Sequence, residues 1–229
     1  MAFDILCDFD GTVSRTDVTD HLLERLALPG WEDLERLWKA GAIGSRECMA
    51  RQVGLIEASR PALDAALDAV EIDPGFPAFL AATARLGIRL TIVSDGIDYA
   101  IRRVLARHGL RGLDIVANRL VAEGERRYRL ESPHADAGCR AASGTCKCAV
   151  AIRASARPTV LIGDGRSDFC ASAAVDLVLA KEALAAHCAR TGRRHLVFGD
   201  FAELTGLLPV AMRLLGDRSR HPAAATEAA

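Results

Sequence analysis

The sequence predicts an α/β fold with three layers: a parallel sheet between two layers of helices, plus a small helical domain inserted into one connection. Short apolar runs of strand length alternate with helical patterns over most of the chain, as buried parallel strands and their crossover helices do. One long segment after the first run contains only helical patterns. Half of the 229 residues are apolar, which is enough for one sizeable core and a smaller accessory domain.

The predicted strands are short runs rich in Ile, Leu and Val. They are residues 3–7, 88–93, 113–117, 159–162, 177–179 and 195–198. Continuous apolar runs, as opposed to alternating ones, are typical of strands buried on both faces. Residues 118–130 differ, because two alternating runs flank residues 123–125, and this pattern predicts a β-hairpin.

Helical patterns occupy the intervals between these runs. In the core we expect helices at 76–86, 99–108, 147–154, 168–173, 182–191 and 200–215. The segment 14–73 contains four more helical patterns, at 19–27, 31–39, 45–56 and 61–70, and no convincing strand. At about 60 residues, this segment is too long for a structureless loop inside a compact domain. We therefore expect it to form a small helical cap domain.

These elements divide the chain into three parts. Residues 1–13 and 74–215 form the α/β core, and residues 14–73 form the helical cap. Residues 216–229 are polar and Ala-rich, and we expect this tail to be disordered.

The charge composition argues against a nucleic-acid partner. Lys and Arg (29) almost balance Asp and Glu (30), and the basic residues are scattered with no basic block. No apolar stretch approaches the roughly 18–20 residues that span a bilayer, and the N-terminus lacks a signal-peptide pattern. With an odd set of seven cysteines, we expect a reduced, cytoplasmic protein without a membrane partner. Nothing in the sequence indicates an oligomeric state.

Polar residues follow three of the predicted strands, at the edge where open α/β sheets place their ligands. The first strand leads into DFDGT at 8–12, the second into SDG at 94–96, and the strand at 159–162 into GDGRSD at 163–168. Lys147 lies between the last two blocks, at the predicted start of a helix. These side chains are expected to meet at one site.

The residue types in these blocks suit a divalent cation. Asp8 and Asp10 are two residues apart just past a strand, so both can reach one site. Two close carboxylates repel each other unless a cation lies nearby, and Asp164 adds a third acidic side chain. A cluster of oxygen ligands suits Mg²⁺, which also accepts a substrate phosphate oxygen.

A bound phosphoryl group needs partners beyond the metal. Lys147, the Ser94 hydroxyl and the backbone N–H groups around Gly11 and Gly96 are suited to bind its oxygens. The sequence therefore predicts a site for a small phosphorylated metabolite with Mg²⁺ as cofactor.

Taken together, the four blocks resemble the haloacid dehalogenase superfamily of phosphohydrolases. They are DFDGTV at 8–13, VSDG at 93–96, Lys147, and GDGRSD at 163–168. Any one block is a weak signal, but all four in this order, each after a predicted strand or at a helix start, are specific. The resemblance covers residues 3–13 and about 74–198. It implies a Rossmann-like three-layer core and a Mg²⁺-dependent phosphatase.

The resemblance also implies a role for each residue. Asp8 would be the nucleophile that forms an aspartyl-phosphate intermediate, and Asp10 would protonate the leaving alcohol and then activate water. Ser94 and Lys147 would hold phosphate oxygens. Asp164 would bind Mg²⁺ together with Asp8 and the backbone carbonyl of Asp10, and Asp168 would brace Lys147 or the metal site. Asp10 argues against a dehalogenase, because that branch lacks the second aspartate.

The position of the insertion resembles the phosphoserine-phosphatase-like branch, and within it the methionine-salvage phosphatases of hydroxy-keto-methylthiopentenyl phosphate. The features shared with the latter are Asp17, Arg51 before VGL at 53–55, PH at 133–134, and GTCK at 144–147. The chain has a sparser cysteine run than those enzymes. It also carries Asp17 where phosphoserine phosphatases have glutamate and Asp95 where glycine is usual. The substrate therefore stays open, with phosphoserine as the alternative.

We expect Asp17 and Arg51 to face the closed site from the cap and to set specificity, with Gln52 as the alternative to Arg51. Trp31 and Trp38 are seven residues apart, so they share one helix face, in the cap core or in a lid.

Plainer interpretations exist for several residues. Asp8 and Asp10 could cap a turn, Ser94 and Asp168 could cap helices, and Lys147 could be a surface lysine. A phosphate-binding regulatory module without turnover is the alternative of another class, disfavoured because no block is missing. Cys139, Cys146 and Cys148 near His134 lack the paired C-x2-C spacing of common structural zinc sites, so we expect free thiols.

Overall fold

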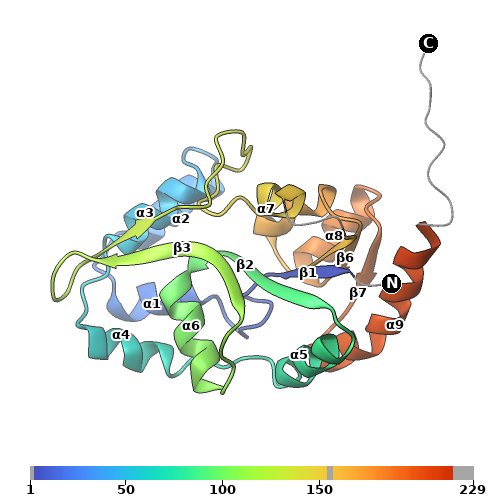
Figure 1. Cartoon of the computed structure of the whole chain (residues 1–229). Coiled ribbons are helices and arrows are strands. Elements are labelled where there is room, and N and C mark those ends of the chain that lie inside the picture. The colour runs from blue at the N-terminus through green and yellow to red at the C-terminus, as the bar shows by residue number, and fades with distance from the viewer. Residues whose placement is uncertain (1–2, 154–156, 219–229) are drawn as a thin grey trace, which may run out of the picture.

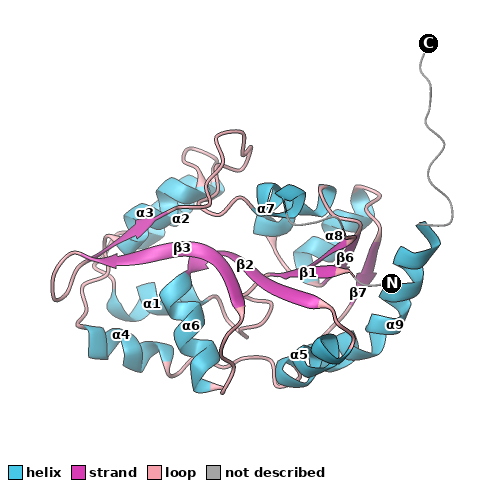
Figure 2. Ribbon diagram, viewed as in Figure 1, coloured by secondary structure: helices cyan, strands magenta, loops and turns pink. Residues whose placement is uncertain are grey.

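The computed structural model describes residues 3–153 and 157–218, and its centre is a seven-stranded sheet. The strand order is β4-β3-β2-β1-β5-β6-β7, and every neighbouring pair is parallel except β3 and β4. The strands are β1 (Asp4–Cys7), β2 (Arg89–Ile97), β3 (Asp114–Ala122), β4 (Tyr128–Glu131), β5 (Thr159–Gly163), β6 (Leu177–Ala180) and β7 (His195–Val197). The predicted α/β fold with a parallel sheet is confirmed (Figures 1 and 2).

Helices cover both faces of the sheet. Successive apolar side chains of the central strands point to opposite faces, so each face needs a layer of helices to bury them. Ile5 of β1 packs in one hydrophobic cluster with α5 (Phe76–Arg85), α6 (Asp98–Arg107) and α9 (Phe201–Arg218). Leu6, the next residue, packs in a second cluster with α7 (Lys147–Arg153) and α8 (Glu182–Arg190). Strands β5 and β6 are buried along their whole length, as their uninterrupted apolar runs predict.

Two strands and one predicted helix of the core differ most from the prediction. Strand β2 does not end at Val93 but continues through Ser94, Asp95 and Gly96 to Ile97, with a shift in its register against β3. Strand β3 is one strand that starts in the core and continues as the first arm of the predicted hairpin. The helix predicted at 168–173 is wrong, because this stretch forms two short 3-10 turns, Arg166–Asp168 and Ala171–Ala173. The buried Asp168 side chain accepts a hydrogen bond from Lys147, and this tertiary contact outweighs the local preference for a helix.

Four helices fill the inserted segment, as expected. They are α1 (Val18–Leu26), α2 (Trp31–Lys39), α3 (Ser45–Val53) and α4 (Arg60–Leu67). Helix α3 stops at Val53, before the predicted end at 56, because Ile56 forms an isolated β-bridge with Ala27.

The inserted helices are attached to the α/β core along two seams (Figure 1). Helix α4 lies against α6, where the Arg103 guanidinium forms an ion pair of 2.7 Å with Asp68. The β3–β4 hairpin reaches the insertion on the other side, where the Tyr128 hydroxyl donates a hydrogen bond to the Ala58 carbonyl (3.1 Å). The division into a core and a cap domain stays a prediction.

The final helix α9 continues to Arg218, three residues beyond its predicted end, and the rest of the predicted tail (219–229) lies outside the described residues. Within residues 3–153 and 157–218, no helix combines the length and the apolar character needed to cross a bilayer.

Candidate active site

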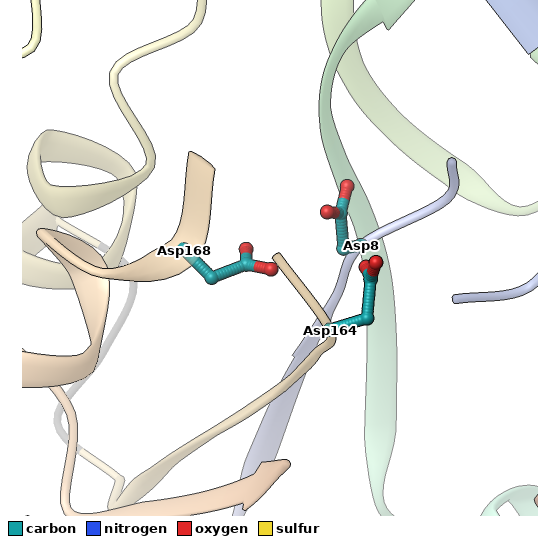
Figure 3. Close-up of side chains that lie close together, drawn as sticks. All are labelled: Asp8, Asp164 and Asp168. Carbon is teal, nitrogen blue, oxygen red and sulfur yellow. The ribbon is translucent and has the colours of Figure 1, made fainter. Parts of the chain in front are cut away.

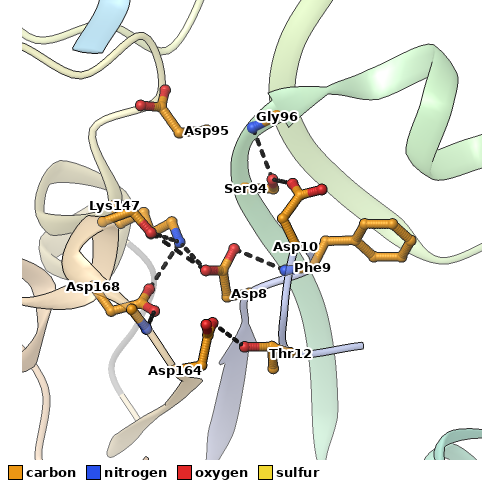
Figure 4. A network of polar contacts seen from close by, with 12 residues as sticks. Asp8, Phe9, Asp10, Thr12, Ser94, Asp95, Gly96, Lys147, Asp164 and Asp168 are labelled. Atoms are coloured by element: carbon orange, nitrogen blue, oxygen red, sulfur yellow. Dashed lines mark hydrogen bonds and ion pairs between the residues drawn. The ribbon is translucent and has the colours of Figure 1, made fainter. Parts of the chain in front are cut away.

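The sequence blocks meet at one edge of the sheet, because β1, β2 and β5 are neighbours and run in the same direction. Asp8 directly follows β1, Ser94 lies in β2, and Asp164 directly follows β5. Lys147 is the first residue of α7 and extends its side chain toward the same point (Figure 4).

Lys147 holds two buried carboxylates together. Its Nζ atom lies 2.7 Å from Asp8 Oδ2 and 2.8 Å from Asp168 Oδ1, and it also donates to the Ser167 hydroxyl (3.1 Å). Burial by itself would lower the pKa of Lys147, but the Asp168 and Asp8 carboxylates outweigh it and the pKa is raised. Lys147 is therefore a permanent cation beside Asp8.

Asp168 is fully buried behind Lys147. Burial first, and then the Asp8 carboxylate, raise the pKa of Asp168 to about 7, although Lys147 acts in the opposite direction. Gly163 makes room for this side chain, since a Cβ atom there would lie 2.2 Å from Asp168 Oδ2. In this geometry Asp168 contacts Lys147, the first of its two expected positions.

Asp10 accepts hydrogen bonds on both carboxyl oxygens. The Val18 N–H donates to Oδ1 (2.9 Å) and the Ser94 hydroxyl donates to Oδ2 (3.0 Å), while Ser94 Oγ accepts from the Gly96 N–H (2.8 Å). Desolvation, followed by the charges of Asp17 and Asp8, raises the pKa of Asp10 well above its ordinary value. A raised pKa favours the protonated carboxyl group, which is the form that acts as a general acid.

Three aspartates gather where a metal ion could bind. Asp8, Asp164 and Asp168 each offer a carboxylate oxygen, and these oxygens lie within 4.8 Å of one another (Figure 3). Burial first, and then the charge of Asp8, raise the pKa of Asp164, although Thr12 and Lys147 act in the opposite direction. Oxygen donors in this arrangement fit a hard divalent cation.

The loop after β1 fits closely around Asp164. The Thr12 hydroxyl donates a hydrogen bond to Asp164 Oδ1 (2.7 Å). Gly11 has a φ of +69°, and a Cβ atom at this position would lie 2.7 Å from Asp164 Oδ2. Glycine is therefore needed at position 11 both for the left-handed backbone and for the close approach.

Asp8, Asp10, Ser94 and Asp164 line a cleft of about 220 Å³ between the sheet edge and the inserted helices, and Lys147 and Asp168 lie behind its surface. The inserted helices contribute the wall opposite Asp8. It consists of Asp17, Thr19, Asp20, Glu35, Trp38, Ser45, Cys48, Met49 and Gln52.

The two predicted specificity residues are placed differently. Asp17 lines the cleft and also caps α1, where it accepts the Asp20 N–H (3.0 Å). Arg51 lies on the exposed face of α3, paired with Glu47 at 3.2 Å, and does not line the cleft. Gln52, the alternative, is buried and lines it.

Several residues at the site were not identified from the sequence. Ser167 contacts both Lys147 and Asp8, and only its position inside the GDGRSD block could have indicated this. Arg166 lies 5.6 Å from the ring of Trp38 on α2, across the mouth of the cleft. Asp95 lines the cleft too, but it bonds to residues outside the phosphate blocks.

Comparison with known proteins gives a consistent result. A family model described as haloacid dehalogenase-like hydrolase matches residues 5–173. Two relatives are 2-hydroxy-3-keto-5-methylthiopentenyl-1-phosphate phosphatases. The one from Geobacillus kaustophilus is 31% identical over 214 residues (89% of this chain, 94% of the relative), and the one from Exiguobacterium sp. is 29% identical over 214 residues (91% and 98%).

A third relative is longer than this chain. The bifunctional enzyme MtnB/MtnX of Bacillus licheniformis is 30% identical over 209 residues, which cover 89% of this chain and 48% of that enzyme. The chain thus spans about half the length of this relative.

Solved structures share the fold. A phosphoserine phosphatase with an analogue of its phospho-aspartyl intermediate superposes with a TM-score of 0.68 at 16% identity, over 91% of this chain and 98% of that one. A cytosolic 5′-nucleotidase IIIB bound to cytidine gives a TM-score of 0.61 at 15% identity (96% and 86%). The match of the family model to residues 5–173 shows that the chain belongs to the haloacid dehalogenase-like hydrolase family.

Proposed function

We propose that the chain is a Mg²⁺-dependent phosphomonoesterase that hydrolyses a small organic phosphate through an aspartyl-phosphate on Asp8. The observation that carries the proposal is the position of the Asp8 carboxylate, buried at the end of β1 between the Lys147 ammonium and the Asp164 carboxylate. Asp10, with its raised pKa, lies two residues along the chain and faces the same cleft.

Asp8, Asp164 and the backbone carbonyl of Asp10 would hold Mg²⁺. When bound, the ion supplies the positive charge that lets Asp8 and a phosphate dianion approach each other. Asp168 is near enough to join this group, but its ion pair with Lys147 favours a supporting role.

The residues then divide the reaction between them. An Asp8 oxygen forms a bond to phosphorus while the bond to the leaving oxygen breaks, and Asp10 gives its proton to that oxygen. In the second step the Asp10 carboxylate takes a proton from water, whose oxygen bonds to phosphorus and releases phosphate and free Asp8. Lys147, Ser94 and the N–H groups around Gly11 and Gly96 balance the charge on the phosphoryl oxygens.

For the substrate we propose a phosphate ester whose organic part is an uncharged keto- or hydroxy-alkyl group. The methionine-salvage relatives are named for a phosphate of this kind. The wall formed by the inserted helices carries Asp17, Asp20 and Glu35 beside Trp38 and Met49. Arg166 is the one cationic side chain among the described residues that line the cleft. This wall offers little to a substrate carboxylate, so phosphoserine is the less favoured alternative.

The free state of all seven cysteines supports a cytoplasmic location, which we also propose.

Turnover of an aryl phosphate by the purified chain, with and without Mg²⁺, tests the proposed reaction. We expect phosphate release that stops in excess chelator and returns when Mg²⁺ is restored, while Ca²⁺, with its looser coordination, does not restore it. Full activity in chelator would contradict the metal assignment. Binding of inorganic phosphate without any turnover would instead favour a phosphate-binding module.

A further inference from the structure

Asp95 lies within the SDG block, between two residues of the phosphate site, yet its side chain points elsewhere. Ser94 Oγ bonds to Asp10, and the Gly96 N–H bonds back to Ser94. The Asp95 carboxylate projects away from the Ser94 hydroxyl, as alternate side chains of a strand do (Figure 4). Asp95 is not among the aspartates that gather at the candidate metal site.

The Asp95 carboxylate accepts hydrogen bonds from three separate segments. The Ser45 hydroxyl, on the first residue of α3, donates to Oδ2 (2.5 Å). The Thr145 backbone N–H donates to Oδ1 (2.8 Å), as does the Asn118 side-chain amide of β3 (3.2 Å). An ionised carboxylate only accepts hydrogen bonds, so it can satisfy all three donors at once.

One of these bonds fixes the loop that leads to Lys147. Thr145 is two residues before Lys147, and the Cys146 N–H in between is bonded to the His134 carbonyl (3.0 Å). Helix α7 begins at Lys147 and has only seven residues, so the preceding loop sets where its side chain starts. The Thr145–Asp95 bond therefore helps to place the ammonium group that contacts Asp8.

Another of these bonds joins the inserted helices to the sheet edge. The Ser45–Asp95 bond lies beside a backbone bond from the Arg46 N–H to the Ala142 carbonyl (2.9 Å). On its far side lies a second cavity of about 740 Å³, which shares Trp38, Ser45, Asp95, Arg166 and Ser167 with the cleft. These shared residues form the partition between the two cavities.

We propose that Asp95 is a positioning residue that couples closure of the inserted helices over the cleft to placement of Lys147. The same carboxylate holds Ser45, on the wall formed by the inserted helices, and Thr145, on the loop before Lys147, so each contact supports the other. This inference rests on the proposed function, because it assigns Asp95 a part in the same phosphate site.

The test compares Ser45→Ala, Asp95→Ala, Asp95→Asn and their combinations with the wild type. Ser59→Ala is the matched control, because Ser59 caps α4 in the same insertion but does not line the cleft. We would measure kcat and KM with an aryl phosphate, the affinity for inorganic phosphate by calorimetry, and thermal unfolding.

Ser45→Ala should lower kcat by about tenfold, the scale of one lost hydrogen bond to a charged group. It should also weaken phosphate binding by about threefold, because the Asp95 carboxylate then holds Thr145 and the lysine loop less firmly. Asp95→Ala should lower kcat further and weaken phosphate binding about tenfold, because it removes the bond to the lysine loop itself. Adding Ser45→Ala to Asp95→Ala should change nothing more, since their shared bond is already gone. Ser59→Ala should leave kcat and phosphate affinity at the wild-type values.

Asp95→Asn should retain more activity than Asp95→Ala. Its carbonyl oxygen can still accept from the Thr145 N–H, and its amide can donate to the Ser45 hydroxyl.

Independent, multiplying effects of Ser45→Ala and Asp95→Ala would overturn the coupling, and so would unchanged phosphate affinity in Asp95→Ala. Should Asp95→Ala fail to fold, Ser45→Ala decides. A lowered kcat together with a weakened phosphate affinity supports the proposal, and wild-type phosphate affinity overturns it. Failure of the proposed function is distinct, because it would show as a wild-type protein without phosphatase turnover. The variants' phosphate affinities would then still report on Asp95.

Discussion

At the scale of single residues, Asp8 is the side chain on which the proposed chemistry depends. We predict that Asp8→Asn lowers kcat by several powers of ten, because an amide cannot form the covalent intermediate. The fold should persist, since Lys147 keeps its ion pair with Asp168. Steady-state kinetics and circular dichroism check both points. A folded variant with more than about a tenth of the wild-type kcat would remove Asp8 from its role.

Asp10 should affect the second step more than the first. With an activated aryl phosphate, whose leaving group needs little protonation, Asp10→Asn should still form the phosphorylated enzyme but should not activate water. We therefore expect phosphate to accumulate on Asp8. Intact-protein mass spectrometry of quenched enzyme should show the added phosphoryl group, which Asp8→Asn in the same background should abolish. If Asp10→Asn keeps the wild-type kcat and carries no phosphoryl group on Asp8, Asp10 does not take part in hydrolysis of the intermediate.

Asp20 is a residue for which the structure predicts a pH effect on stability. Burial, together with the charges of Asp17 and Glu35, raises the pKa of Asp20 from 3.8 to about 6. The folded protein therefore binds a proton on the Asp20 carboxyl group more tightly than the unfolded chain does. The stability that this protonation contributes is present below about pH 4 and is lost as the pH rises through about 6.

Asp20→Asn should accordingly raise the free energy of unfolding by about 1 kcal/mol at pH 7.5. This figure already subtracts the favourable interaction between the Asp20 carboxylate and the N-terminus of α1, which the substitution removes. Below pH 4 this gain should vanish. Urea unfolding at both pH values is the measurement, with Asp33→Asn on the exposed side of α2 as the control. A gain of equal size at both pH values would contradict the assignment to Asp20.

At the scale of elements, the inserted helices are packed into the main core. Leu63 and Leu67 of α4 and Val53 of α3 belong to the same buried cluster as Phe76 and Ile101 of the core helices. The α4–α6 ion pair and the β3–β4 hairpin join the same parts. Such shared packing implies that the insertion and the core unfold together.

Leu67→Ala should test this coupling. We expect it to lower the free energy of unfolding by about 2–4 kcal/mol, the usual cost of emptying a buried leucine site, within a single transition. Leu86→Ala is the control, because Leu86 is 44% exposed and its truncation should cost much less. An early, separate transition of the insertion in Leu67→Ala would show that the two parts are independent.

The elements also show how far the sequence pattern reaches. Apolar runs identified β1, β5 and β6 to within one residue, because burial on both faces leaves a continuous signal. The pattern ended β2 at Val93 because Ser94 and Asp95 are polar, yet the strand continues past them to Ile97, which pairs with Asn118 of β3. It predicted a helix at 168–173, where the contact of Asp168 with Lys147 decides the backbone.

At the scale of the whole molecule, the charge of the closed cleft should decide between substrates. Asp17, Asp20 and Glu35 face the cleft, while Arg51 lies outside it. We predict that kcat/KM for an uncharged hydroxy- or keto-alkyl phosphate exceeds that for phosphoserine by tenfold or more, about 1.4 kcal/mol in transition-state binding. Asp17→Glu, which reaches one methylene further toward an ammonium group, should narrow this ratio. A tenfold preference of the wild type for phosphoserine would make that substrate the better assignment.

The sequence alone was enough to predict the candidate site residues and the sheet edge at which they meet. Asp8, Asp10 and Asp164 stand immediately after apolar runs, and parallel neighbouring strands must bring such residues together. The orientation of the inserted helices toward that edge could be read only from the folded structure. A shift of one position along a helix turns a side chain by about 100°, so no pattern could tell that Gln52 lines the cleft and that Arg51 lies outside. The bonds of Asp95 to Ser45 and Thr145, each 50 residues away in the chain, exist only because the insertion and the lysine loop pack against the end of the sheet.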